Sequence, residues 1–271
     1  YYSIGYGGFM KTRIISAIVA LLITVPLIIL GGVYFEIGIG VLAALAFKEI
    51  VDLPKSHGKY PKFIIVFGLL GVLFLILSNT IDTSLTKGFT YQVLAAIILF
   101  LIMPIIFVKN ESYTSKDAIY LIGIVLFLGL SFNLLNIVRL RSLKTFIFLI
   151  CIPMVNDIFA YLIGSKFGKN KMCPSISPKK TWEGSIGGLV LGTLVGSIIH
   201  YYLLNSFNLK ILLLIVVLSA VGQIGDLIMS KIKRENEIKD FSNIMPGHGG
   251  ILDRLDSTIF VFIAYILMTW I

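Results

Sequence analysis

The sequence predicts an all-α, polytopic helical membrane protein with about nine transmembrane helices. Two features of the composition lead to this class. Hydrophobic residues make up 57% of the 271 residues and charged residues only 14%, whereas soluble domains carry about 25% charged residues. The apolar residues also form long continuous runs, while the strands of a transmembrane barrel would alternate polar and apolar residues over short segments.

The apolar runs define the expected helices. A helix needs about 20 mostly apolar residues to cross the hydrocarbon core, and the last run is short by this measure. Prolines within three runs, Pro26, Pro104 and Pro153, should bend those helices. In chain order the expected spans cover about residues 13–32, 33–52, 62–79, 90–108, 118–136, 144–164, 183–205, 210–232 and 257–271.

Four glycines recur every four residues in the run 183–205, namely Gly184, Gly188, Gly192 and Gly196. Small residues at this spacing let two membrane helices approach closely. We therefore expect this face to pack against another helix and not to carry chemistry. Glycine-rich helix faces of this kind are also the basis for expecting a homodimer.

The basic residues predict the orientation of the chain. Most of the 23 Lys and Arg residues fall on one side if the N-terminus is cytoplasmic, and cytoplasmic loops carry such an excess. This pattern predicts an N-in, C-out topology, with Arg139, Arg141 and Lys144 as outer exceptions. The net charge of +9 is then explained by topology and by anionic membrane lipids, so no nucleic-acid partner is expected. Cys151 and Cys173 should be free thiols.

The N-terminal end differs in character from the rest of the chain. Residues 1–9 have no apolar period, and Met10 followed by Lys11 is typical of a natural start. We interpret residues 1–9 as a leader or a remnant of protein production. Residues 10–271 are expected to form a single integral membrane domain, whose working part covers about residues 157–271.

The segment 231–256 is strongly polar within an otherwise apolar chain. Polar groups at membrane depth are costly and usually mark a functional site. Asp253 and Asp256 are three residues apart, so a helix places both on one face, and Asp226 lies in the apolar run before them. Carboxylates without a Cys or His cluster favour a hard cation such as Mg²⁺, bound together with substrate phosphates. The alternative is that Asp226 pairs with Lys or Arg to stabilise a helix contact.

A glycine turn precedes these carboxylates, with Gly247, His248, Gly249 and Gly250 after Pro246. Glycines let the backbone approach a ligand, and turned backbone N–H groups can hold phosphate oxygens. The N-terminus of the following helix also favours anions. The alternative interpretation, an ordinary glycine-rich turn, fits the glycines taken alone.

A second polar segment, 175–184, lies before the run 183–205. Its adjacent lysines, Lys179 and Lys180, could hold a triphosphate or a lipid phosphate, and the alternative is a cytoplasmic loop that only sets topology. Asp157 lies inside the run 144–164, where it could line a nucleotide pocket or pair with a lysine.

Together these motifs resemble the phosphatidate cytidylyltransferase family, also called CDP-diacylglycerol synthases. An upstream element of that family is similar to the segment from Ser177 to Gly184, Asp157 fits its upstream acidic position, and Met245 stands where Ile or Leu is expected. The C-terminal signature of the family is matched at Ser230, Lys233, Arg234, Lys239, Asp240, Pro246, Gly247, His248, Gly249, Gly250, Asp253, Arg254 and Asp256.

The resemblance implies a reaction in which CTP and phosphatidate give CDP-diacylglycerol and pyrophosphate. The expected partners are these two substrates, membrane lipids and a second copy of the chain, in a bacterial cytoplasmic membrane with the site facing the cytoplasm. The expected cofactor is Mg²⁺, as one or two cations, held by Asp226, Asp253 and Asp256. Catalytic roles are implied for Lys179, Lys180, Lys233, Arg234, Lys239, Asp240, His248 and Arg254. Substrate-binding roles are implied for Asp157, Ser177, Thr181, Glu183, Gly247, Gly249 and Gly250.

Two other functions stay open on the sequence alone. A CTP-dependent lipid kinase would share a membrane bundle and a CTP site but would release CDP. An ion-coupled transporter would carry charges at the membrane midplane, broken helices and inverted repeats. The sequence has broken helices without a repeat, and its polar residues gather at one face, which disfavours a translocation path.

Overall fold

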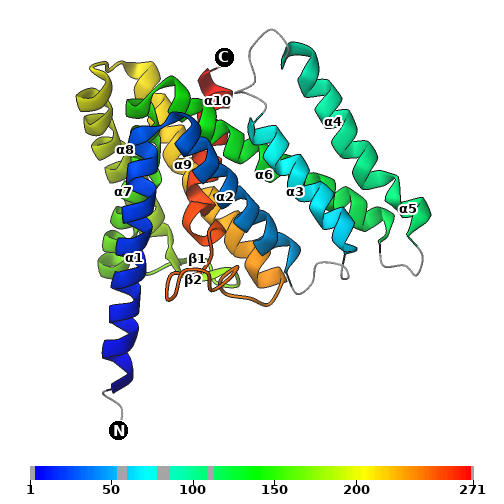
Figure 1. Ribbon diagram of the computed structural model, residues 1–271. Coiled ribbons are helices and arrows are strands. Elements are labelled where there is room, and N and C mark those ends of the chain that lie inside the picture. The colour runs from blue at the N-terminus through cyan, green and yellow to red at the C-terminus, as the bar shows by residue number, and fades with distance from the viewer. Residues whose placement is uncertain (1–3, 54–59, 78–85, 109–112, 270–271) are drawn as a thin grey trace. The chain divides into compact units, whose positions relative to one another are not determined.

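The computed structural model describes residues 4–53, 60–77, 86–108 and 113–269. Helices dominate, and one small hairpin interrupts them (Figure 1). The expected all-α class is therefore confirmed, and a helix occurs at each of the expected spans. The elements are α1 (Ile4–Leu30), α2 (Gly32–Val51), α3 (Lys62–Leu77), α4 (Thr86–Ile102), α5 (Pro104–Phe107), α6 (Ser115–Arg141), α7 (Leu143–Phe167), β1 (Lys171–Cys173), β2 (Ser177–Thr181), α8 (Trp182–Leu204), α9 (Leu209–Glu235) and α10 (Leu252–Thr269).

Within the described residues, five helices are long and apolar enough to cross a membrane. They are residues Thr12–Leu30 of α1 and the whole of α6, α7, α8 and α9. Helices suit this environment because each satisfies its own backbone polar groups. The chain is thus a helical membrane protein, and the full set of nine spans and their orientation remain predictions. Of the expected leader, residues 1–3 lie outside the described residues, whereas residues 4–9 belong to α1.

The chain divides into two compact units. The first runs to Ile137 and takes in Asp240–Leu252, and the second consists of Val138–Lys239 and Asp253–Ile271. The first unit is therefore built from two stretches of chain that are far apart in sequence. The expectation of a single membrane domain stays a prediction.

The core of the first unit is apolar and closely packed. Phe47 of α2 lies against Gly68 of α3, where an added Cβ would come within 2.7 Å of its ring. A Cβ on Gly129 of α6 would likewise come within 3.0 Å of the Cβ of Leu75 on α3. These contacts tie α2, α3 and α6 together, because van der Waals packing at small residues is what holds membrane helices to one another.

In the second unit, the repeated glycines of α8 pack against other helices, as the sequence predicted: the first three lie against α7 and Gly196 lies against Ile215 of α9. A Cβ added at Gly184 would come within 2.7 Å of the carbonyl oxygen of Ala160, and one at Gly188 within 2.8 Å of the Ala160 Cβ. A Cβ at Gly192 would lie 3.1 Å from Oδ1 of Asn156. This face is therefore used inside the chain and gives no independent support to a homodimer, which stays a prediction.

Local signals fix the ends of the helices in the second unit. Ser142 caps α7 by accepting from the backbone N–H of Thr145, and Thr181 caps α8 by accepting from that of Gly184. Asn208 caps α9 in the same way through Ile211 N–H. These side chains satisfy N–H groups that have no partner within their own helix.

The hairpin was not expected from the sequence. Strands β1 and β2 pair antiparallel, with Lys171 opposite Thr181 and Cys173 opposite Ser177. The segment has no apolar alternation, because its side chains are mostly polar, and so it gave no strand signal. Both cysteines are free, as predicted. The predicted break at Pro104 is also present, since α4 ends at Ile102 and Pro104 begins α5.

Candidate functional site

The second unit contains a cavity of about 390 Å³. This volume lies within the range of ligand pockets, about 300–1,000 Å³. Helices α7, α8 and α9 and the hairpin all contribute to its wall. The lining residues are Asp157, Ala160, Tyr161, Gly164, Ser165, Lys171, Met172, Lys179, Lys180, Thr181, Gly184, Ser185, Gln223 and Leu227. Four of the predicted site residues therefore meet here, namely Asp157, Lys179, Lys180 and Thr181.

The hairpin holds its lysines at this cavity. Thr181 ends β2 and also caps α8, so the strand and the helix are joined at one residue. Glu183 accepts from the backbone N–H groups of Lys169 and Asn170, each at 3.2 Å, and from the Asn170 side chain at 2.8 Å. Its carboxylate thus fastens the loop before β1 to α8. The role that the structure gives Glu183 is in holding this loop.

A polar network supports the cavity from α7 and α9. Gln223 donates to Oδ1 of Asn156 and to the carbonyl oxygen of Ser185, each at 3.0 Å. Asn156 in turn donates to the carbonyl oxygen of Ser219 at 2.9 Å. Because Gln223 and Asn156 are polar side chains within apolar helices, these bonds fix how α7, α8 and α9 meet.

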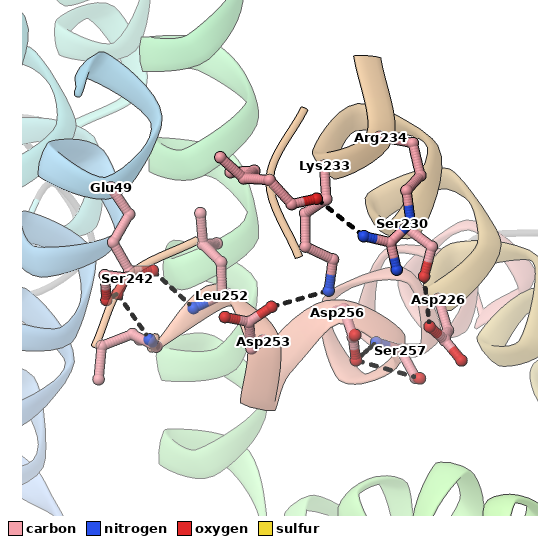
Figure 2. Close-up of polar contacts among 12 residues, drawn as sticks. Glu49, Asp226, Ser230, Lys233, Arg234, Ser242, Leu252, Asp253, Asp256 and Ser257 are labelled. Atoms are coloured by element: carbon pink, nitrogen blue, oxygen red, sulfur yellow. Dashed lines mark hydrogen bonds and ion pairs between the residues drawn. The ribbon is translucent and has the colours of Figure 1, made fainter. Parts of the chain in front are cut away.

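Lys180, which lines the cavity, forms an ion pair with α9. Its Nζ lies 2.5 Å from Oδ2 of Asp226, and both side chains are only partly exposed. Ser230, one turn further along α9, donates to the other oxygen of Asp226 at 3.2 Å (Figure 2). The alternative interpretation of Asp226, a pairing with a lysine, therefore describes its state in this structure.

A second lysine–carboxylate pair lies between α9 and α10. Nζ of Lys233 is 2.7 Å from Oδ1 of Asp253 (Figure 2), and the side chains are 10% and 4% exposed. Charged groups this deeply buried are stable only when they are paired. Lys233 and Asp253 therefore neutralise each other in the structure.

Asp256 has a different environment, since burial and the charge of Asp226 act on its carboxyl more strongly than the charge of Lys233 does. Its Oδ1 accepts from the backbone N–H of Ser257 at 2.8 Å. Burial raises the pKa of the Asp256 carboxyl to about 7, with the charge of Asp226 as the second cause and that of Asp157 as a smaller one. The Ser257 hydrogen bond and the charge of Lys233 oppose this shift. Asp226 and Asp256 are thus close enough to repel each other.

The carboxylates of α9 and α10 can be compared with the ligands that the predicted Mg²⁺ ion would require. Among the described residues, no group of three Asp, Glu, His or Cys side chains stands arranged as a metal site. Asp226 and Asp256 nevertheless fit a hard cation, because a divalent ion is what relieves the repulsion between two carboxylates. Asp253 is held by Lys233, and its part as a ligand stays a prediction.

The glycine turn belongs to the first unit. Gly247 and Gly249 have φ values of 77° and 86°, which only glycine adopts without strain. Ser16 of α1 contacts Nδ1 of His248 at 2.8 Å and donates to the carbonyl oxygen of Pro246 at 3.0 Å. Arg13 donates to the carbonyl oxygen of Gly247 at 2.9 Å. The turn is therefore held by α1, and His248 has a partner within its own unit.

Helix α2 holds the end of the same turn through Glu49, which is 2% exposed. Its carboxylate accepts from the backbone N–H groups of Ile251 and Leu252 at 2.8 and 2.9 Å. These are N–H groups at the N-terminus of α10, a position that the sequence predicts to be favourable for anions. In the structure a carboxylate of the chain occupies this position.

The remaining predicted residues lie at the surface or bind backbone. Arg234 donates to the carbonyl oxygens of Ile176 and Ile238, at 3.2 and 2.8 Å, and so fixes the loop of the hairpin. Lys239, Asp240 and Arg254 are exposed. Ser177 opens β2 opposite Cys173.

Comparison with known proteins adds to this geometry. The model of the cytidylyltransferase family matches residues 11–271, almost the whole chain. The chain belongs to the cytidylyltransferase family. Relatives include proteins named phosphatidate cytidylyltransferase from Staphylococcus epidermidis and Staphylococcus aureus, each 34% identical over 93% of this chain and 96% of theirs. One from Staphylococcus haemolyticus is 33% identical over the same shares.

Sequence reasoning missed the residues of this cytidylyltransferase-family chain that hold the glycine turn in the first unit, and two polar residues at the cavity of the second. Arg13, Ser16 and Glu49 act on the glycine turn from helices in the N-terminal half, where the sequence predicted only a spanning role. Gln223 and Ser185 at the cavity looked like ordinary polar residues of apolar runs. The only indication in the sequence was an acidic residue, Glu49, at the end of an apolar helix, where burial of a charge is costly. This indication did not show which residues Glu49 contacts.

Proposed function

We propose that this chain transfers a cytidylyl group from CTP to phosphatidate, giving CDP-diacylglycerol and pyrophosphate. The observation that carries the proposal is the cavity of the second unit, which combines Lys179 and Lys180 with Asp157 and whose Lys180 is paired with Asp226. Lysines suit phosphates, and the carboxylates suit the cation that accompanies a nucleotide. The name of the relatives supplies the two substrates.

The reaction joins two anions, so its main difficulty is electrostatic. A phosphate oxygen of phosphatidate attacks the α-phosphorus of CTP, a P–O bond forms there, and the bond to the β-phosphate oxygen breaks as pyrophosphate leaves. Lys179 and Lys180 bind phosphate oxygens and lower the repulsion between the substrates. When Lys180 turns to the triphosphate, Asp226 is released from its lysine.

A divalent cation would be held by Asp226 and Asp256, with Mg²⁺ as the proposed ion. When bound, it neutralises charge on the triphosphate and on the leaving pyrophosphate. The chain's own residues bring the groups together: the hairpin carries the lysines, and α9 and α10 carry the carboxylates. Positioning of this kind accounts for much of the rate in reactions between two bound substrates.

The same proposal places the protein in the bacterial cytoplasmic membrane with nine spans, its N-terminus inside and its site open to the cytoplasm. CTP enters from the cytoplasm, and phosphatidate arrives from the bilayer. The basic residues support this orientation, because the hairpin lysines fall on the predicted inner side. The proposal also includes a homodimer, which rests on the glycine-rich helix faces of the sequence alone.

The deciding experiment uses purified protein in mixed micelles with phosphatidate, Mg²⁺ and CTP labelled at the α-phosphate. Cytidylyl transfer moves the label into lipid and releases pyrophosphate. A lipid kinase would instead leave labelled CDP in water, and lack of CTP consumption together with CTP-independent flux would favour a transporter. The variants Lys179→Ala and Lys180→Ala should each raise the KM for CTP if these lysines bind the triphosphate.

A further inference from the structure

The Glu49 carboxylate connects two distant parts of the first unit. Glu49 lies in the last turn of α2 and is almost fully buried. Its Oε1 accepts from Oγ of Ser242 at 2.6 Å and from the backbone N–H of Ile251 at 2.8 Å. Its Oε2 accepts from the backbone N–H of Leu252 at 2.9 Å (Figure 2). Both oxygens are therefore used, and all three donors come from the stretch 242–252.

These bonds supply an acceptor for backbone N–H groups at the start of α10, where the local sequence has none. The first N–H groups of a helix have no partner inside it, and a nearby Ser, Thr, Asp or Asn usually supplies one. Ile251 precedes α10 and has no side-chain acceptor. Glu49 supplies the acceptor from 203 residues away in the sequence. Its negative charge also suits the N-terminal end of a helix dipole.

Gly250 makes the contact possible. A Cβ at this position would clash with Oε1 of Glu49 and would lie only 2.7 Å from Oε2. Any other residue would push the carboxylate away from the two backbone N–H groups. The last glycine of the turn is therefore explained by the approach of Glu49, without a bound ligand.

We propose that Glu49 is a positioning residue of the transfer site: its carboxylate caps α10 and thereby fixes the helix that carries Asp253 and Asp256. Asp253 is the second residue of α10, and Asp256 follows one turn later. A frayed or rotated first turn displaces both side chains. This role rests on the cytidylyl transfer proposed above, and Glu49 itself touches no substrate in it.

The test compares Glu49→Gln with Glu36→Gln. The amide keeps the size of the side chain, but its NH₂ group cannot accept a hydrogen bond, so one backbone N–H of α10 loses its partner. Glu36 is a matched control, because it is a second buried carboxylate of α2, 5% exposed. Each variant is measured for kcat, for the KM of CTP, for the Mg²⁺ concentration at half-maximal rate, and for hydrogen exchange of the peptide containing Ile251 and Leu252.

For Glu49→Gln we expect kcat to fall about 10–100-fold and the Mg²⁺ requirement to rise, because misplaced groups lose rate steeply and supporting residues tune metal affinity. The KM for CTP should change less than twofold, since the cavity lysines lie elsewhere in the chain. Exchange at Ile251 and Leu252 should become faster in this variant only. Glu36→Gln should keep the wild-type Mg²⁺ requirement and wild-type exchange at α10.

A double-mutant cycle with Gly250→Ala gives an independent check. Because the added methyl displaces the Glu49 carboxylate, Gly250→Ala should lower kcat to a similar extent, and adding it to Glu49→Gln should cost little more. If Glu49→Gln fails to fold in detergent, Gly250→Ala and Glu49→Asp are compared in its place.

The outcomes separate this proposal from the proposed function. Wild-type protein that transfers the label, together with a Glu49→Gln variant of normal kcat and Mg²⁺ requirement, overturns the positioning role alone. Unchanged exchange at Ile251 and Leu252 in that variant overturns the cap itself. Wild-type protein that transfers no label overturns the proposed function, and the exchange measurement still decides whether Glu49 caps α10.

Discussion

At the scale of single residues, the carboxylates of the second unit differ in whether they are paired with a lysine. Asp226 is paired with Lys180 and Asp253 with Lys233. Asp256 is influenced most by burial and by the charge of Asp226, and the charge of Lys233 has a smaller, opposing effect. Lysines thus occupy the places where a cation is expected, which keeps buried negative charges balanced before substrates bind.

The pair between Lys233 and Asp253 gives a stability prediction. Lys233→Met or Asp253→Asn alone leaves one buried group without its partner, and we expect each to lower the free energy of unfolding by about 3–5 kcal/mol. Combining the two should restore most of this loss, because no unpaired charge then remains. Thermal unfolding in detergent measures the effect. Additive losses in the double variant would contradict a direct pairing.

The carboxyl of Asp256 gives a pH prediction for metal-free protein. Its pKa in the folded state is raised to about 7, so the fold favours its neutral form. The contribution of Asp256 to stability is therefore fully present below its unfolded pKa of 3.8 and is lost as the pH rises through its folded pKa of about 7. Melting in the presence of a chelator should occur at a lower temperature at pH 8 than at pH 6.

Two comparisons test the origin of this pH dependence. In Asp256→Asn the difference between pH 6 and pH 8 should shrink, because the titrating group is gone. Adding Mg²⁺ to wild-type protein should raise the melting temperature most at pH 8, where the Asp256 carboxyl, whose pKa is about 7, is charged. Equal slopes in wild type and Asp256→Asn would exclude Asp256 as the cause.

At the scale of elements, the packing of α7 against α8 allows a matched comparison of glycines. Gly188 has a carbon neighbour at 2.8 Å from an added Cβ, whereas Gly123 of α6 has nothing within 4 Å. Gly188→Ala should destabilise the protein by about 1–3 kcal/mol through overpacking. Gly123→Ala should be neutral or stabilising by up to about 1 kcal/mol, because alanine favours a helix. Melting temperatures that fall equally in both variants would refute the packing role of Gly188.

The elements also show what could be read from the sequence. Continuous apolar runs predicted the helices, and the spacing of the α8 glycines predicted its packing face. The hairpin was not predicted, because adjacent lysines such as Lys179 and Lys180 occur in loops as well as in strands. The cap that Glu49 provides for α10 was not predicted for another reason. It depends on a contact between residues 203 apart in the sequence, and a local sequence pattern does not indicate such a contact.

At the scale of the whole molecule, the orientation in the membrane can be tested with the native thiols. The N-in, C-out prediction places Cys173 inside and the loop before α9 outside. In intact cells, a membrane-impermeant maleimide should label a Ser206→Cys variant from which both native cysteines have been removed. The same reagent should not label Cys173 of the wild-type protein. Cys173 should react once the cells are permeabilised. Labelling of Cys173 from outside would reverse the orientation.

The distance in sequence between Glu49 and α10 has a consequence for biosynthesis. The ribosome completes α2 long before it makes the stretch 242–252, so in the nascent chain the Glu49 carboxylate is without its three donors. An unpaired carboxylate in the bilayer is costly, which favours keeping the end of α2 near the membrane surface until those donors arrive. Assembly of this part of the protein is therefore a late event of synthesis, because the Glu49 carboxylate gains its three donors only when the stretch 242–252 has been made.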